Sequence, residues 1–493
     1  MASSTPVEPA LAYATPRGRG VLAATVLGSG LAFIDATVVN VALPRIGEAL
    51  GAGMSGLTWT INGYMLTLAS LILLGGSLGD RFGRKRIFLI GVVWFAVASL
   101  LCGLAPGIHA LIAARALQGV GGALLTPGSL ALLQASFRPE DRAQAIGAWS
   151  GLGGIAGAAG PFLGGWLVQV ASWRWVFLIN LPVALAVVVL TLRCVPESKD
   201  PAASQHLDVP GAVLGAVGLG SLTWGLIAWQ DLGAGSHRVQ LLLALGVLAL
   251  AGFLLREHRA KEPMLPLGLF ASPLFSAVNA VTFVVYAALG GMFFWLVLAL
   301  QVVAGFSPLV SGLALLPVTV VMLLLSARMG ALAQRIGPRL PMTVGPLIAA
   351  LGTAALTRVH AGSTYVGSVL PPVLLFGLGL SLTVAPLTAT VLAAAPVRHA
   401  GLASGVNNAV ARVAGLLAVA VLPLVAGLSG EAYSTPALLQ PAYHRAMWLC
   451  AALLALGGLL AALFVRRPLT APAPATPRGP CHHCCVDAPP LTQ

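Results

Sequence analysis

The stretch GSLGDRFGRKR, residues 76–86, lies between two apolar runs and decides how the rest of the chain is interpreted. Glycines 76 and 83 permit a tight turn between two helices, and Asp80 can pair with a neighbouring arginine or face a helix N-terminus. We expect this stretch, called the latch loop below, to break and re-form contacts between two conformations. An ordinary basic loop is the alternative interpretation. The candidate gating residues are Gly76, Asp80, Arg81, Gly83 and Arg84 of this stretch, together with Arg142 just before the span at 143–168.

Composition excludes a water-soluble fold for most of the chain. Of its 493 residues only 8% are charged and 58% are hydrophobic, and the mean hydropathy is +0.93. A soluble domain carries roughly 25% charged residues, so most of this chain must face lipid. The formal net charge of +13 then indicates basic loops on one side of a membrane, and no nucleic-acid partner is expected.

Apolar runs of about 20 residues recur, and each is long enough to cross about 30 Å of hydrocarbon. An even number of runs places both termini on one side, and the basic loops concentrate on that side. We therefore expect a multi-pass protein of the bacterial inner membrane with both termini in the cytoplasm and an uncleaved first helix. The fourteen candidate spans are 21–43, 57–77, 87–105, 109–133, 143–168, 175–193, 210–229, 239–255, 274–300, 312–332, 341–358, 367–392, 402–426 and 445–465.

An internal repeat divides the chain into halves. The segment GALAQRIG at 330–337 echoes GSLGDRFG at 76–83 with an offset of 254 residues (330 minus 76), and the same offset relates Gly147 to Gly401. Duplicated halves are how secondary transporters build a central site with alternating access. The expected division is a cytoplasmic segment at 1–20, six-helix bundles at 21–193 and 273–465, a linker with two inserted spans at 194–272, and a disordered cytoplasmic tail at 466–493.

One acid and one base stand inside spans of the first half. Asp35 is the acid, and a charged side chain there costs about 2.5–3.5 kcal/mol on insertion scales, so it should face water or a partner. Arg115, on the fourth span, lies at a compatible depth for an ion pair. Desolvation favours a neutral carboxyl and a nearby cation favours the carboxylate, so Asp35 can load and release a proton. The alternatives are a static packing role for Asp35 and a backbone carbonyl as the partner of Arg115.

Glycines form a stripe along the fifth span. Gly153, Gly157, Gly160 and Gly164 follow one another at helical spacing, so another helix can approach closely, and Pro161 adds a kink. Packing is the first interpretation of this stripe. A role in gating between the halves is a further hypothesis, for which Gly157, Gly160, Pro161, Gly164 and Gly165 are the candidates.

Polar residues in other spans are candidates for a substrate cavity. Arg412 lies about 11 residues into the thirteenth span, near the middle of the membrane, and the sequence shows no second intramembrane acid to neutralise it. Carbonyls, water or a substrate must then serve as its partner. The cavity candidates are Asn40, Asn62, Gln118, Asn407, Asn408 and Arg412.

Neither a metal nor a cofactor is expected. The six cysteines do not suggest a disulfide framework, because two lie in apolar runs and the rest fall on the expected cytoplasmic side. The tail segment CHHCC at 481–485 has metal-ligand chemistry but is too compressed to wrap a tetrahedral ion easily. No phosphate-binding loop is present, which leaves the proton gradient or passive flow to drive any transport.

The latch loop resembles the signature between helices 2 and 3 of the major facilitator superfamily. Over about residues 20–467 the chain resembles the fourteen-helix drug:proton antiporter family, the EmrB/QacA-like group. That resemblance implies proton coupling at Asp35, proton transfer at Arg115, and an antiporter motif at Gly160 and Pro161. The residues that carry it are Asp35, Asn40 and Pro44, RALQG at 115–119, GPFLGG at 160–165, WRW at 173–175 with Asn180 and Pro182, and PMLPL at 263–267.

The sequence therefore predicts an all-α polytopic membrane protein with the major facilitator fold: two six-helix bundles plus two inserted helices. The expected function is proton-coupled export of small hydrophobic compounds such as drugs or antibiotics, with protons and the lipid bilayer as the other partners and a monomer as the working form. One alternative is a proton-coupled or passive transporter of an endogenous metabolite. The other is a membrane sensor or scaffold, and the absence of catalytic clusters argues against an enzyme.

Overall fold

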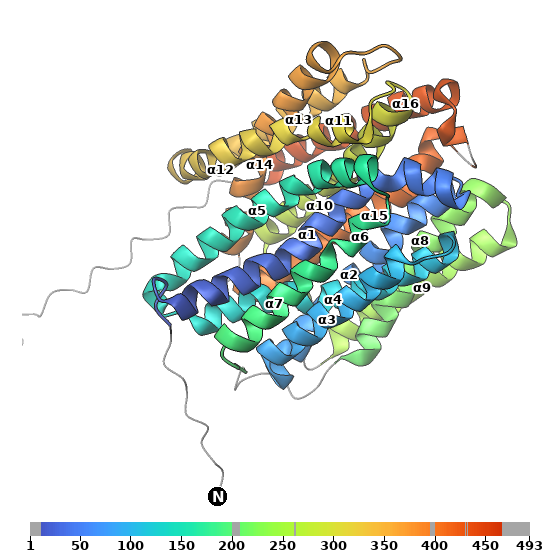
Figure 1. The fold of residues 1–493 in the computed structure, drawn as a ribbon. Helices are drawn as coiled ribbons and strands as arrows, with labels where there is room; N and C mark the ends of the chain where they lie inside the picture. The colour runs from blue at the N-terminus through green and yellow to red at the C-terminus, as the bar shows by residue number, and fades with distance from the viewer. Residues whose placement is uncertain are drawn as a thin grey trace, which may run out of the picture.

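The computed structural model describes residues 11–199, 208–260, 263–394, 400–428, 430 and 432–465, and these residues form helices and no strand. Figure 1 shows the helices side by side in one large bundle. The tail with its cysteines and histidines lies outside the described residues, as do residues 1–10. Within them, Cys102, Cys194 and Cys450 are free thiols.

The helices before residue 200 form the N-terminal bundle: α1 Pro16–Leu50, α2 Met54–Phe82, α3 Arg84–Gly103, α4 Ile108–Ser136, α5 Pro139–Val170, α6 Trp175–Leu178 and α7 Asn180–Cys194. The inserted pair is α8 Val209–Leu232 and α9 His237–Arg259. The C-terminal bundle comprises η1 Leu267–Ala271, α10 Pro273–Val302, α11 Pro308–Leu313, α12 Leu316–Ile336, α13 Arg339–Leu356, η2 Tyr365–Val369, α14 Leu370–Ala393, α15 Ala400–Ala426, η4 Ala432–Ser434 and α16 Pro436–Phe464.

The fourteen expected spans correspond to helical segments of this bundle. Thirteen segments among the described residues are long and apolar enough to cross a membrane. The one remaining expected span, 143–168, lies within α5, which is 32 residues long. Three spans are each built from two consecutive helices: α6 with α7, α11 with α12, and η2 with α14. The all-helical polytopic fold is therefore confirmed.

Helix α1 is longer than the expected span at 21–43. It begins early because Thr15 caps it, accepting a hydrogen bond from the amide of Gly18, and because Pro16 fits the first turn of a helix. Pro44 lies inside the helix and does not end it. The helix stops only at Gly51, whose φ of 60° is a left-handed conformation that glycine adopts without strain.

The inserted pair contacts both bundles through α8. Trp224 of α8 packs edge-on against Trp59 of α2, with ring centroids 6.2 Å apart. Near the end of α8, the Gln230 side chain donates a 3.2 Å hydrogen bond to the carbonyl of Ala420 on α15. Helix α9 packs against α8 and exposes Leu241 and Leu248, as a lipid-facing helix does.

The two ends of the bundle differ in how the halves meet. We call the end that holds the α2–α3 turn at Gly83 the basic end, and the other the opposite end. At the opposite end the Met54 amide donates to the carbonyl of Gly430 at 2.7 Å, and the Tyr433 hydroxyl donates to the carbonyl of Ala52 at 2.8 Å. Backbone and side-chain hydrogen bonds thus join the N-terminal and C-terminal bundles at this end.

Candidate functional site

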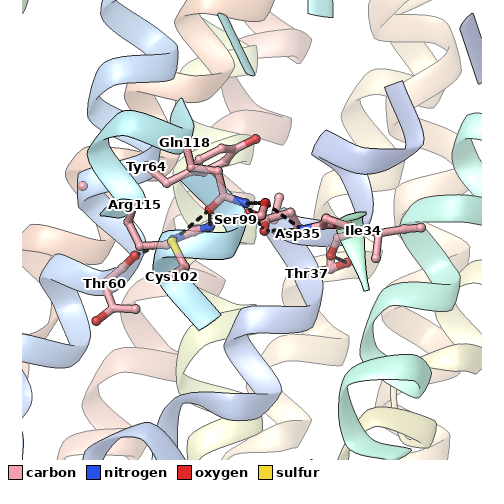
Figure 2. A network of polar contacts seen from close by, with 12 residues as sticks. Ile34, Asp35, Thr37, Thr60, Tyr64, Ser99, Cys102, Arg115 and Gln118 are labelled. Atoms are coloured by element: carbon pink, nitrogen blue, oxygen red, sulfur yellow. Dashed lines mark hydrogen bonds and ion pairs between the residues drawn. The ribbon is translucent and has the colours of Figure 1, made fainter. Parts of the chain in front are cut away.

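Asp35 and Arg115 form a buried ion pair in the N-terminal bundle. The Arg115 Nη1 atom lies 2.5 Å from Asp35 Oδ2, and the two side chains are 0% and 1% exposed. Figure 2 shows the pair between α1 and α4, surrounded by polar side chains from neighbouring helices. The expected pairing, inferred from depth alone, is therefore present. Two opposite charges so close and so dry offset part of each other's desolvation cost.

Gln118 connects both members of the pair. Its Nε2 donates to Asp35 Oδ1 at 2.7 Å and to Ser99 Oγ at 2.8 Å, while its Oε1 accepts from Arg115 Nη1 at 2.6 Å. Asn180 at the start of α7 adds two longer bonds of 3.3 Å, to Asp35 Oδ1 and Ser99 Oγ. We call Asp35, Arg115, Gln118, Ser99 and Asn180 the carboxylate cluster. The sequence proposed Gln118 for a substrate cavity, whereas its side chain is buried in this cluster.

Arg115 is held on its other sides as well. Its Nε donates to the backbone carbonyl of Thr60 on α2 at 3.0 Å. The guanidinium carbon lies 4.4 Å from the ring centre of Tyr64 and 5.7 Å from that of Phe177, within the range of cation–π attraction. Arg115 is therefore fixed in place whether or not Asp35 carries a charge.

Glycines of α5 allow close contact with α1. A Cβ atom at Gly160 would collide with the Thr37 hydroxyl, and one at Gly164 would lie 2.7 Å from Cγ2 of Val38. A Cβ at Gly157 would meet only an ordinary contact, 3.8 Å from Phe33. Packing, the first interpretation of the stripe, thus describes Gly160 and Gly164 well.

The next residues of α5 meet the other bundle. A Cβ at Gly165 would lie 2.5 Å from the carbonyl oxygen of Pro308 and 2.7 Å from the Cα of Leu309. A Cβ at Gly312 on α11 would collide with the carbonyl of Pro161. Backbone therefore touches backbone where α5 crosses α11 at the opposite end, and glycine is required on both sides of the contact.

The latch loop forms an ion pair and docks on a later segment. Arg84 binds the Asp80 carboxylate at 2.7 Å, one helical turn away. Gly83 turns with a φ of 114°. Its neighbours donate backbone bonds, from Arg84 to the carbonyl of Ser198 at 2.9 Å and from Lys85 to the Glu197 carboxylate at 3.1 Å. This docking of the latch loop on the segment after α7 was not expected from the sequence.

The remaining latch candidates have local contacts. Arg81 lies 5.0 Å from the ring centre of its neighbour Phe82. Gly76 faces Pro127 of α4, 3.6 Å from the position a Cβ would take. Arg142 donates to the carbonyl of Phe137 at 3.1 Å. None of these three contacts reaches the C-terminal bundle.

The predicted cavity asparagines fall into different environments. Asn40 donates to the carbonyl of Ala36 on its own helix, and Asn408 donates likewise to Ser404 and is exposed. Asn407 donates to both Asn279 and Thr282 of α10, at 3.0 and 2.8 Å, and so joins α15 to α10. Asn62 is fully buried, and neither polar atom of its side chain has a hydrogen-bond partner in the part of the chain that the structure describes.

Two further features lie outside the predicted sites. Besides Asp35, the described residues include two buried carboxylates, Asp208 just before α8 and Glu257 near the end of α9, and Glu257 accepts from the amide of Leu265 at 3.0 Å. Glu257 does not stand out in the sequence, because arginines and a histidine surround it there. An apolar cavity of about 510 Å³ opens between α11, α12 and α14. Its walls include Val310, Pro317 and Tyr365 and none of the predicted site residues.

A bundle of membrane-spanning helices in two halves, with a buried ion pair in one half, defines a polytopic membrane protein of the transporter type. The model of the Major Facilitator Superfamily matches residues 25–419. The chain therefore belongs to that superfamily, as the latch loop predicted.

Relatives and solved structures agree with this assignment. The chain is 38% identical to the tetracenomycin C resistance and export protein of Streptomyces glaucescens, over 88% of this chain and 82% of that protein. It is 35% identical to the cephamycin export protein CmcT of Amycolatopsis lactamdurans, over 92% of each. Its fold resembles the inward-facing, unoccupied structure of a bacterial homologue of the human lysosomal transporter Spinster, with a TM-score of 0.66 and 19% identity over 93% of this chain and 100% of that one.

Proposed function

We propose that this protein is a proton-coupled exporter of small hydrophobic compounds, among them antibiotics. The relatives named above are resistance and export proteins, which supports export of compounds of that kind. The single observation that supports proton coupling is the carboxylate cluster, in which an acid inside a membrane span is paired with a buried arginine. The alternative of an endogenous metabolite as substrate has no comparable support.

The coupling step is an exchange of partners by Asp35. When a proton binds Asp35, the carboxylate loses its charge and its attraction for Arg115 falls. Arg115 keeps the carbonyl of Thr60 and the amide oxygen of Gln118 as acceptors, so it stays in place. Protonated Asp35 is then free to move with α1. Release of the proton on the other side of the membrane restores the pair and closes the cycle.

Orientation and state complete the proposal. The basic end faces the cytoplasm of a bacterial cell, in the inner membrane, with both termini on that side. The described conformation, in which Tyr433 and Met54 join the bundles at the opposite end, is then sealed toward the outside. The protein works as a monomer without a cofactor, and the proton gradient drives substrate out.

The test is dye efflux from proteoliposomes under an imposed proton gradient, with Asp35→Asn as the variant. The matched control is Glu48→Gln on the same helix, because the Glu48 carboxylate is 66% exposed and pairs only with Arg45 in the described residues. We expect the parent and the Glu48→Gln variant to pump, and Asp35→Asn to bind dye without pumping it. Equal gradient-driven efflux by all three proteins would refute coupling at Asp35.

A further inference from the structure

Arg412 is a membrane-embedded cation for which the described residues supply no partner. It lies 12 residues after the start of α15, or about 18 Å along a helix that extends about 40 Å. Of the residues that the structure describes, none forms an ion pair or a hydrogen bond with its guanidinium, and the side chain is only partly exposed. Placing a charge at this depth in the membrane costs free energy, so charged residues of this kind usually line a cavity and take part in function.

The contrast with Arg115 shows what a satisfied arginine looks like in this protein. Arg115 has a carboxylate, an amide oxygen, a backbone carbonyl and two aromatic rings around it. Its charge is cancelled within the N-terminal bundle by Asp35. No described carboxylate cancels the charge of Arg412, so the interface between the bundles retains one positive charge.

The surroundings of Arg412 come from both bundles. Helix α15, which carries Arg412, packs against α2 of the N-terminal bundle and against α10 of the C-terminal bundle. One turn before Arg412, Asn408 is exposed on the same face of α15. A Cβ atom at Gly415, on the next turn, would meet nothing within 4 Å. Arg412 therefore lies beside open space, on a helix that packs against both bundles.

A polar group on α2, a helix that packs against α15, also lacks a partner. The Tyr64 side chain is fully buried, yet its hydroxyl has no hydrogen-bond partner among the residues that the structure describes, and Figure 2 draws no contact to it. A buried hydroxyl left unpaired costs free energy that an acceptor oxygen would recover. The ring of the same tyrosine lies against Arg115. Tyr64 thus packs its ring against Arg115 of the carboxylate cluster, while its hydroxyl remains an available donor.

We propose that Arg412 binds an anionic oxygen of the exported compound, so that the preferred substrates are hydrophobic molecules with one acidic group: a carboxylate, a sulfonate, or an ionised phenol or enol. The charge of such a monoanion cancels the charge of Arg412, and the apolar body of the molecule suits the apolar bundle. The Tyr64 hydroxyl, unpaired among the described residues, is a further donor on α2, the helix of the N-terminal bundle that packs against α15. This inference rests on the proposed export function and names the substrate class for it.

The test compares two dyes that share one skeleton. 1-Anilinonaphthalene-8-sulfonate carries a permanent negative charge, and N-phenyl-1-naphthylamine lacks the sulfonate and is neutral. Fluorescence titration of the purified protein in lipid nanodiscs, with empty nanodiscs as background, gives a dissociation constant for each dye. We expect Arg412→Gln to weaken binding of the sulfonate about 10- to 100-fold and to leave the neutral dye nearly unchanged, since a hydrogen bond to a charged group is lost for one dye only.

Two further variants sharpen the comparison. Arg412→Lys keeps the charge and should retain most of the sulfonate affinity. Arg328→Gln removes another arginine, an exposed one near the basic end of α12, and should leave both dissociation constants unchanged. Equal weakening of both dyes by Arg412→Gln, or no weakening of either, would overturn the proposal.

The parent protein alone also tests the idea, should Arg412→Gln fail to fold. A parent that shows no saturable binding of the sulfonate above empty nanodiscs contradicts it. The binding assay uses no proton gradient, so its outcome is separate from that of the export assay. If the protein exports the neutral dye under a proton gradient and Arg412→Gln changes neither dissociation constant, the export function is supported and only the anionic substrate class is refuted.

Discussion

Neutralising Asp35 and Arg115 singly and then together should show that their buried charges depend on each other. Asp35→Asn leaves a buried guanidinium without a counter-charge, and Arg115→Gln leaves a buried carboxylate in the same position. The double variant contains neither charge. We therefore expect each single variant to be less stable than the double variant, although the double variant loses more contacts.

The magnitudes follow from the contacts in the carboxylate cluster. Breaking a buried ion pair by removing one partner costs about 3–5 kcal/mol. The lower part of that range applies here, because Gln118 and Asn180 still donate to Asp35, and Thr60 still accepts from Arg115. The double variant loses about two hydrogen bonds, or about 2 kcal/mol. The summed loss of unfolding free energy in the two single variants should thus exceed the loss in the double variant by about 4 kcal/mol.

Reversible unfolding by sodium dodecyl sulfate in mixed micelles, followed by tryptophan fluorescence, measures these differences. Glu48→Gln paired with Arg45→Gln is the matched cycle, because this ion pair is exposed on the same helix and should couple by less than about 1 kcal/mol. If the effects of Asp35→Asn and Arg115→Gln simply add, the two charges are screened by water, and the reasoning about the buried pair is wrong.

Three further predictions concern the moving parts. Gly165→Ala should disfavour the conformation closed at the opposite end, because its Cβ would press on Pro308. The control is Gly147→Ala on the same helix, whose Cβ meets open space and should not change this conformation. The reactivity of a cysteine introduced at the opposite end measures how far that end is closed. Tyr433→Phe loses the bond to Ala52 and should shift the same reactivity in the same direction by about 1 kcal/mol, and unchanged reactivity would contradict a sealing role. Asp80→Asn should change the unfolding free energy by less than about 1 kcal/mol, since the Asp80–Arg84 pair is partly exposed, while it slows dye efflux; an unchanged efflux rate would reduce the latch loop to an ordinary basic loop.

Much of the fold and one part of the site could be predicted from the sequence, because hydrophobic length and charge are strong signals in lipid. Apolar runs of 20 residues identify spans directly. An acid or a base inside a span is rare, so Asp35 and Arg115 were the natural pair to expect. Their contact in the structure follows from the cost of leaving either alone.

The neutral members of the carboxylate cluster were harder to predict. Ser99 and Asn180 are single polar residues in apolar helices, and many such residues merely bond to their own helix, as Thr25 does. Which of them reaches Asp35 depends on how α3 and α7 are rotated against α1. Periodicity gives the buried face of one helix and not its rotation against another, so neither residue could be assigned to the site. Asn180 was noted only as part of a family motif.

Helix boundaries illustrate a second limit of sequence reasoning. The expected first span, 21–43, stops just before Pro44, and proline removes a backbone hydrogen bond from a helix. In the structure α1 continues through it to Leu50, and Gly47 packs beneath Tyr433 of the C-terminal bundle. Tertiary contact with the other half stabilises this extra turn. Such a contact cannot be read from residues 44–50 alone.

The packing of α5 supplies a direct mechanical connection between Asp35 and the contact of the two bundles. Gly160 and Gly164 meet α1 at Thr37 and Val38, within one turn of Asp35. One residue further, Gly165 meets the backbone of Pro308 and Leu309, and Pro161 meets Gly312. These close contacts couple the helices, so a shift of α1 at Thr37 displaces α5, and a shift of α5 displaces α11. A change of partners at Asp35 is therefore placed where movement of α1 must reach the C-terminal bundle.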